Sequence, residues 1–211
     1  MLQSIAFLIS GVVFGLSAGI SPGPLLTLAI SETLKFGKKE GVKIAIAPLI
    51  TDIPIILLTV FILASLSKID IFLGFISLVG GLFLFRVAYE NFTVKKLNLK
   101  SKKNEISSIK KGIISNFLNP HPYLFWFFIG GPTLLKSYDL TIIATAFFIL
   151  GFYASLVGSK IVIVLAAEKS RDLLKGKIYS YIIRVLGLLL LIFAIFFIKD
   201  SLTYFNINIF R

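Results

Sequence analysis

Three titratable side chains lie within stretches of the sequence that are otherwise apolar. Asp52 stands in the segment Pro48-Leu-Ile-Thr-Asp-Ile-Pro54, and Lys160 and His121 stand in later apolar segments. A charge at the centre of a bilayer costs roughly 2.5–3.5 kcal/mol on insertion scales, so an intramembrane carboxylate is expected to face the protein interior. Asp52 could therefore carry protons or bind an ammonium group, or it could be a structural carboxyl that is neutral or paired.

Lys160 and His121 each allow two interpretations. Lys160 lies about six residues, or roughly 9 Å of helix, from the nearer end of its apolar segment. Its ammonium could snorkel to the lipid headgroups, or it could pair with Asp52. His121, the only histidine, could relay protons near neutral pH or simply line a cavity. One histidine and no cysteine provide no metal site, and no cofactor is expected.

The same kind of interruption occurs in two apolar segments, Ser21-Pro22-Gly23-Pro24 and Asn119-Pro120-His121-Pro122. Proline lacks an amide hydrogen and breaks the helical ladder. Ser21 and Asn119 are suitable N-caps for a new half-helix whose first residue is a proline. Such a start carries roughly half a positive charge and attracts a carboxylate. Either motif alone could merely kink its helix, but a paired break in two halves of a chain points to a transport site.

The composition is that of a membrane protein. Of the 211 residues, 57% are hydrophobic and 15% are charged, and the mean hydropathy is +0.95. The net charge of +12 does not indicate nucleic-acid binding, because the basic residues lie between apolar runs and form no basic domain. The absence of cysteine excludes disulfides, thiolate metal sites and redox relays.

The apolar runs predict six transmembrane helices in one all-α transmembrane domain that covers residues 1–211. The first run has no basic residue before it and no cleavage site after it, so we expect it to be retained as a span. The spans are expected at 4–34, 41–65, 69–92, 112–135, 140–166 and 178–198.

Basic residues predict the orientation and divide the chain. Sixteen lysines and arginines fall in the first, third and fifth loops and four on the other side, so both termini are expected outside the plasma membrane. The basic cytoplasmic linker 93–111 separates repeat one (1–92) from repeat two (112–211). Three spans per repeat make the two repeats inverted in topology. The first break falls about 18 residues into its span and the second about 8, unless the fourth helix begins near Ser107.

Gly11, Gly15 and Gly19 are four residues apart on the first span and give it a flat face. This face predicts close packing, either within the protomer or across a homo-oligomer. Aromatic residues after the second break, Tyr123, Phe125 and Trp126, are candidates to line a pocket.

The chain resembles the lysine exporter (LysE-type translocator) family, which includes the homoserine/threonine exporters. The likeness covers nearly the whole chain and depends most on Gly19-Ile-Ser-Pro-Gly-Pro24, with the basic turn that follows, Asp52 and Asn119-Pro120. It implies six helices in two inverted repeats and export of amino acids or related small solutes, driven by an ion gradient, usually of protons. It assigns the substrate path to Pro22, Gly23, Pro24, Asp52, Asn119 and Pro120.

Two departures bear on the substrate. Exporters of basic amino acids in this family tend to have an acidic residue where this chain has Phe125, which argues against lysine or arginine. Metal-exporting relatives are disfavoured by a chain with no cysteine and one histidine.

These observations predict a secondary transporter that exports amino acids or related zwitterionic solutes by proton antiport with alternating access. Its partners would be the solute, the proton and the bilayer. The alternatives are a membrane-embedded enzyme, for which no catalytic cluster stands at usable spacing, and a non-transporting scaffold subunit. The substrate-binding residues are expected to be Ser21, Pro22, Gly23, Pro24, Asp52, Asn119, Pro120, His121, Pro122 and Tyr123, with Asp52, Lys160 and His121 in coupling.

Overall fold

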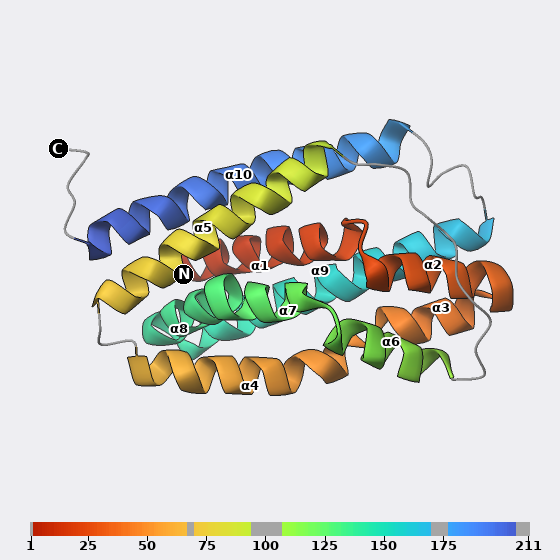
Figure 1. Cartoon of the computed structure of the whole chain (residues 1–211), viewed down its shortest axis with the longest axis horizontal. Helices are drawn as coiled ribbons and strands as arrows, with labels where there is room; N and C mark the ends of the chain where they lie inside the picture. Colours follow the sequence, from red (N-terminus) through yellow and green to blue (C-terminus); the bar gives the residue numbers. More distant parts are fainter. Residues whose placement is uncertain (1, 67–69, 94–106, 170–176, 206–211) are drawn as a thin grey trace.

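The computed structural model describes residues 2–66, 70–93, 107–169 and 177–205, and within these ranges the chain is all-α, with no β-strand (Figure 1). The all-α prediction is therefore confirmed. The elements are α1 (Leu2–Ile20), α2 (Pro24–Phe36), α3 (Lys38–Ala45), α4 (Pro48–Leu66), α5 (Asp70–Phe92), α6 (Ser108–Phe117), α7 (Pro120–Phe125), the π-helical turn η1 (Trp126–Gly130), α8 (Gly131–Leu140), α9 (Ile142–Lys169) and α10 (Lys177–Tyr204).

The closest helix packing is that of α1 along α9. A Cβ at Gly11 would overlap the backbone oxygen of Phe148, and one at Gly15 would overlap that of Phe152. Gly19 is equally close to the Ser159 hydroxyl. The glycine face is thus covered by α9 of the same chain. Of the two alternatives that the sequence allows, packing within the protomer describes this face.

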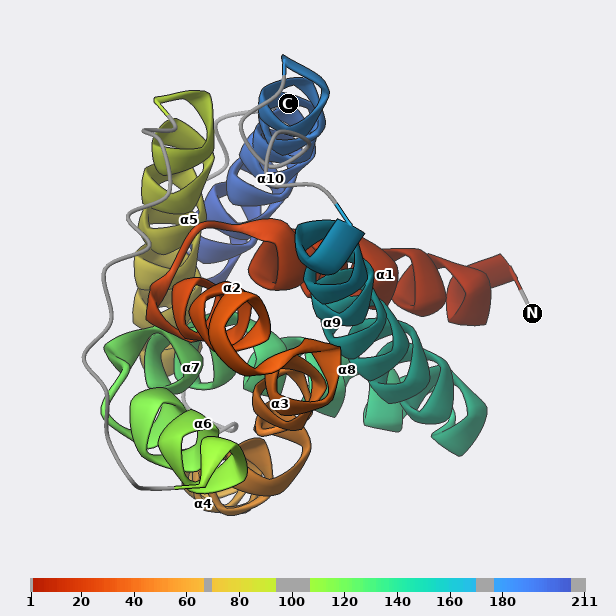
Figure 2. The same cartoon turned by 90° about the vertical axis from the view of Figure 1, so that its right-hand side faces the viewer.

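Helices α5 and α10 form a second pair, which lies along one side of the molecule in both views (Figures 1 and 2). Gly81 of α5 faces the backbone of α10 at Ala194, and Ser201 of α10 donates a hydrogen bond of 2.8 Å to the carbonyl of Gly74. Because both helices are apolar and carry small residues at the contact, they can pack closely along their length.

The helix that follows the second break changes its winding at η1. Pro132 has no amide hydrogen to donate to a carbonyl one turn earlier, and a π-helical turn forms just before it. The Phe128 carbonyl lies against Gly80 of α5, where a side chain would not fit. The π-helical turn also brings Trp126 to a fully buried position.

Helix α4 packs against η1 and α8, and α3 packs against α6.

Three short helices, α2, α3 and α6, gather at one end of the molecule, which faces the viewer in Figure 2. The turn from α2 to α3 is made by Gly37, whose φ of 90° suits glycine best. Between α2 and α6 the carboxylate of Glu32 is almost fully buried and accepts hydrogen bonds from Lys111 and Ser108. We refer to this group, Glu32, Lys111 and Ser108, as the inner ion cluster.

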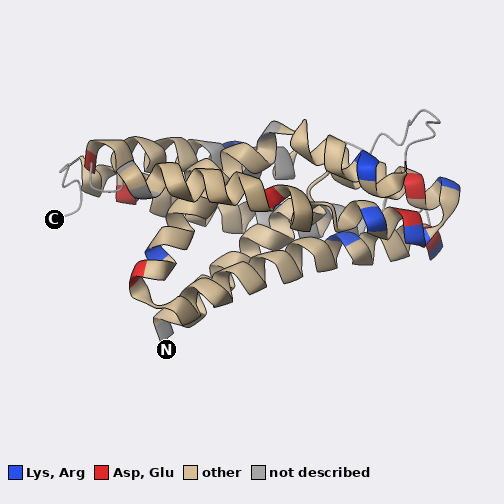
Figure 3. Ribbon diagram, turned by 90° about the horizontal axis from the view of Figure 1, so that it is seen from below, with Lys and Arg blue, Asp and Glu red and all other residues tan. Residues whose placement is uncertain are grey.

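Four helical segments in the described part of the chain are long and apolar enough to cross a membrane, namely Gln3–Ile20, Lys38–Leu63, Ile142–Lys169 and Gly187–Tyr204. Charged residues lie mainly toward the two ends of the helices and leave a largely uncharged zone between them (Figure 3). The fourth predicted span is divided among α6, α7, η1 and α8, so no single helix covers it.

The structure bears on the end of the predicted linker and on the start of the helix before the second break. Most of the predicted linker 93–111 lies outside the described residues, but Ser108 to Lys111 belong to α6. The helix before the second break therefore has 10 residues and starts next to Ser107, whereas α1 has 19. The helix after the first break, α2, has 13 residues. Since α2 and α6 meet at the same end of the molecule, each break lies a similar length of helix from that end.

Candidate functional site

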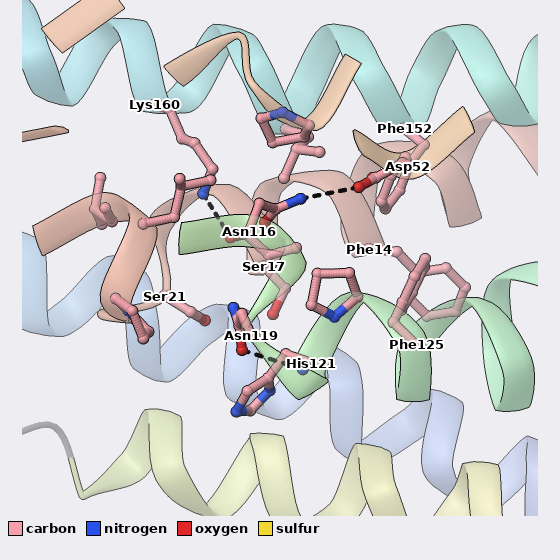
Figure 4. Close-up of a pocket in the computed structure, with 18 of the residues that line it drawn as sticks. Phe14, Ser17, Ser21, Asp52, Asn116, Asn119, His121, Phe125, Phe152 and Lys160 are labelled. Atoms are coloured by element: carbon pink, nitrogen blue, oxygen red, sulfur yellow. Dashed lines mark hydrogen bonds between the residues drawn. The ribbon is translucent and has the colours of Figure 1, made fainter. Parts of the chain in front are cut away.

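The two helix breaks line one cavity of about 250 Å³ in the interior of the helix bundle. Ser21, Pro22, Gly23 and Pro24 come from the first break, and Asn119, His121 and Pro122 from the second. Asp52 of α4 and Lys160 of α9 line the same space. Segments far apart in the chain thus place unwound backbone and two opposite charges around a common volume (Figure 4).

The first break begins after Ile20 and ends at Pro24. The amide of Ser21 still donates to the Ser17 carbonyl at 3.0 Å, so Ser21 closes α1. Gly23 is extended (φ −129°, ψ 178°) and is the N-cap of α2, whose first residue is Pro24. The prediction that Ser21 caps the new helix and that Pro22 begins it is wrong. A residue before proline is held away from the helical region, and Gly23 precedes a proline.

The second break follows the prediction. Asn119 is extended (φ −84°, ψ 122°), Pro120 is the first residue of α7, and the Asn119 side chain accepts a hydrogen bond of 3.1 Å from the His121 amide. Its Oδ1 thereby caps one of the helix's free donors. Tyr123 donates from its hydroxyl to the carbonyl of Phe117 at 3.0 Å, which ties α7 back to the end of α6.

Asp52 is buried and its carboxylate is surrounded by donors from three other elements. Oδ1 accepts from Asn116 at 3.1 Å and lies 3.4 Å from the Thr51 hydroxyl, while Oδ2 accepts from the indole of Trp126 at 3.3 Å and the hydroxyl of Tyr153 at 3.4 Å. A carboxylate has about four lone-pair positions, and Asn116, Trp126 and Tyr153 supply donors for three of them. The single hydrogen of the Thr51 hydroxyl is shared between Asp52 and the Ala47 carbonyl, which lies 3.1 Å away.

Lys160 is also buried, with 4% of its surface exposed. Its Nζ donates to the carbonyls of Ala18 and Gly19 at 3.0 and 3.2 Å. These are among the last carbonyls of α1, where the helix dipole favours a cation. Neither sequence interpretation of Lys160 describes this arrangement: the side chain does not reach the surface, and its hydrogen bonds go to a helix end instead of to Asp52.

Aromatic rings close the part of the cavity near Asp52. Phe125 of α7 stacks on Phe152 of α9 with ring centroids 5.0 Å apart, and the edge of Phe14 of α1 meets Phe125 at 5.9 Å. Figure 4 places these rings at one end and Lys160, Ser21 and Asn119 at the other. The cavity therefore has a polar end at the helix breaks and an aromatic end at the rings, where the hydrogen-bonded carboxylate of Asp52 is the one charged group among the labelled residues.

The comparison with protein families decides the identity of the chain. The family model described as LysE type translocator matches residues 16–201, which is most of the chain. The chain belongs to the LysE type translocator family. Together with the apolar helices, this makes it a multi-pass membrane transporter of amino acids or similar solutes, and not an enzyme. No curated protein and no solved structure matches the chain.

In this LysE type translocator, most of the residues singled out from the sequence line the cavity. Phe125 and Trp126 also line it, as expected. Tyr123 does not: its ring is 41% exposed and its hydroxyl bonds to backbone. Pro120 begins α7, but its side chain lies outside the described part of the structure. Among the described residues, no group of three His, Asp or Glu is placed to hold a metal ion.

Sequence reasoning missed several residues of this translocator's cavity. Asn116 and Tyr153 contact Asp52, while Ser17, Phe14 and Phe152 line the space directly. Two of them carried a readable signal. Asn116 is a polar residue in an apolar segment, three residues before Asn119. Tyr153 is seven residues before Lys160 on α9, so the two share a helix face.

Proposed function

We propose that this translocator exports small zwitterionic solutes, amino acids in particular, by proton antiport, and that the solute occupies the cavity between the two helix breaks. The observation that carries the proposal is the convergence of both breaks and of two buried opposite charges on one space of about 250 Å³. Discontinuous helices that meet at mid-membrane are the usual construction of a substrate site in secondary transporters.

The packing supports a six-span arrangement in two inverted repeats. The first span of repeat one, α1, packs on the second span of repeat two, α9, and the helix of the second break packs in turn on α4 of repeat one. The third and last spans, α5 and α10, pack on each other. This exchange of partners is what two related halves of opposite orientation would produce. With the basic loops inside, both termini face the outside of the plasma membrane.

Alternating access is supported by the position of Phe14. A second, smaller cavity of about 100 Å³ is lined by Ser10, Ser77, Thr133 and Lys136, and Phe14 lines both cavities. Phe14 also contacts Phe193 of α10, with ring centroids 4.6 Å apart. In our proposal this ring separates the central cavity from the smaller one, and a rocking of the two halves moves it aside.

For Asp52 we propose proton exchange in preference to binding of the solute's ammonium group. Three donors of the protein and the neighbouring Thr51 hydroxyl already surround its carboxylate, so an ammonium would have to displace one of them. A proton needs only one oxygen. We assign His121, which lines the cavity from α7, a role in the relay of protons.

The rival interpretation is a scaffold subunit with a filled core, and the polar cavity argues against it. The decisive experiment is flux of radiolabelled amino acids in proteoliposomes with and without a pH gradient. We expect an imposed gradient to drive accumulation of at least one amino acid above its equilibrium level. Equal accumulation with and without the gradient, across a panel of all common amino acids, would refute the proposal of proton antiport.

A further inference from the structure

The ammonium group of Lys160 lies at the polar end of the cavity, and one of its three N–H groups is not used in the hydrogen bonds to α1. Lys160 gives hydrogen bonds to the carbonyls of Ala18 and Gly19, and an ammonium has three N–H groups. Those carbonyls fix the side chain at the end of α1, next to the first break. Since Asp52 is surrounded by other donors, it is not among the hydrogen-bond partners of Lys160.

A second donor lines the same cavity. Ser17 is one residue before Ala18, is 3% exposed, and lines the cavity. Among the described residues its hydroxyl has no hydrogen-bond partner. A buried hydroxyl without a partner is unfavourable, so one that faces a cavity points to a partner supplied from outside the chain. Figure 4 shows Ser17 near Asn116, on the side of Lys160 and Ser21 that faces Phe14.

At the opposite end of the cavity the carboxylate of Asp52 already accepts hydrogen bonds from the protein. Phe14, Phe125 and Phe152 form its wall, and the indole N–H of Trp126 is used by Asp52. A ligand with a negative group at one end and an uncharged, apolar group at the other would satisfy both ends. A cavity of about 250 Å³ has room for one amino acid.

We propose that Lys160 and Ser17 bind the carboxylate of the solute and that the aromatic end receives its side chain, so that the translocator selects neutral amino acids with apolar side chains. This inference rests on the proposed function, because it presumes that a small solute enters this cavity. It differs in substance from a carboxylate held at two half-helix starts, since one of the two, that of α7, is already capped by Asn119.

The test is binding, measured by calorimetric titration of the full chain in nanodiscs. Three probes share one side chain: leucine, 4-methylpentanoate, which lacks the ammonium group, and 3-methylbutylamine, which lacks the carboxylate. We expect leucine and 4-methylpentanoate to bind, and the amine to bind at least tenfold more weakly, because charge-assisted hydrogen bonds are the strong ones. Lys160→Met should weaken leucine binding at least tenfold and abolish its advantage over the amine.

Ser17→Ala is the second variant. It removes a hydroxyl that has no hydrogen-bond partner among the described residues, so it should leave the melting temperature unchanged or higher. It should still weaken leucine binding severalfold, which a purely structural role would not do. Lys39→Met, at an exposed lysine, is the matched control and should bind as the wild type does.

Three results would overturn the inference: no binding of leucine to the wild type, equal binding of the amine and leucine, or unchanged leucine affinity in folded Lys160→Met and Ser17→Ala. The flux assay separates this failure from that of the proposed function. Leucine binding without gradient-driven flux would refute antiport and leave the carboxylate site intact. Gradient-driven flux of other amino acids without leucine binding would do the reverse.

Discussion

The side-chain amide of Asn116 on α6 donates a hydrogen bond of 3.1 Å to Oδ1 of Asp52 on α4. The same Nδ2 lies 2.6 Å from the hydroxyl of Thr51. One amide of the second half of the chain thus holds two neighbouring residues of the first half. Because both partners are buried, this bond joins the two halves at the depth of the cavity.

Asn116→Ala should therefore destabilise the protein by about 1–3 kcal/mol, since it leaves a buried carboxylate with one donor fewer. Thermal unfolding in detergent would show a lower melting temperature. The pairwise contribution is obtained from a cycle with Asp52→Asn, and we expect a coupling free energy of about 0.5–3 kcal/mol. Additive effects of the two substitutions would show that the contact does not stabilise the fold.

Asp52→Asn tests the proposed proton exchange. The variant keeps the shape of the side chain and removes its ability to titrate. We expect exchange of labelled against unlabelled substrate across the membrane to persist, while accumulation driven by a pH gradient falls to the level seen without a gradient. Asp139→Asn, at an exposed position on α8, is the matched control and should retain gradient-driven flux. Gradient-driven accumulation that survives in Asp52→Asn would remove Asp52 from the coupling mechanism.

Gly15→Ala tests the contact between α1 and α9. The added methyl would overlap the Phe152 backbone, which cannot move aside as a flexible side chain can. We expect a loss of about 1–3 kcal/mol from forced separation of the two helices, measured as a lower melting temperature. Gly158→Ala on α9 is the control: its Cβ would meet nothing within 4 Å, so the variant should be as stable as the wild type or slightly more stable. Equal melting temperatures for the two variants would contradict the packing described for Gly15.

The sequence was sufficient to predict the apolar helices, because hydrophobicity and length depend only on local composition. It also located both breaks, since two prolines one residue apart disfavour a continuous helix. A single proline does not suffice, because Pro54 lies inside α4. It did not show that Ser21 would stay in the α1 ladder, a result that depends on Gly23 preceding a second proline.

Contacts between distant segments were beyond the sequence. Nothing local shows that Lys160 meets the carbonyls of Ala18 and Gly19, or that the glycines of α1 face α9. Ser17 was overlooked because a serine in an apolar helix commonly bonds to its own backbone. Only the fold shows that its hydroxyl is left without a partner in the described chain and that it faces the cavity.

The inner ion cluster makes the sharpest prediction about stability. Glu32 accepts hydrogen bonds of 2.9 Å from Lys111 and 3.2 Å from Ser108, and its side chain is 2% exposed. Removing one partner of a buried pair leaves an uncompensated charge, so Lys111→Met should destabilise the protein by about 3–5 kcal/mol. Adding Glu32→Gln removes that charge, and the double variant should recover much of the loss.

Lys43→Met is the matched comparison, because its pair with Glu40 is half exposed and such pairs contribute about 0–1 kcal/mol. All variants would be compared by thermal unfolding in the same detergent. The order of melting temperatures should be Lys43→Met highest, then the double variant, then Lys111→Met. If Lys111→Met melts no lower than Lys43→Met, the cluster does not hold α2 and α6 together.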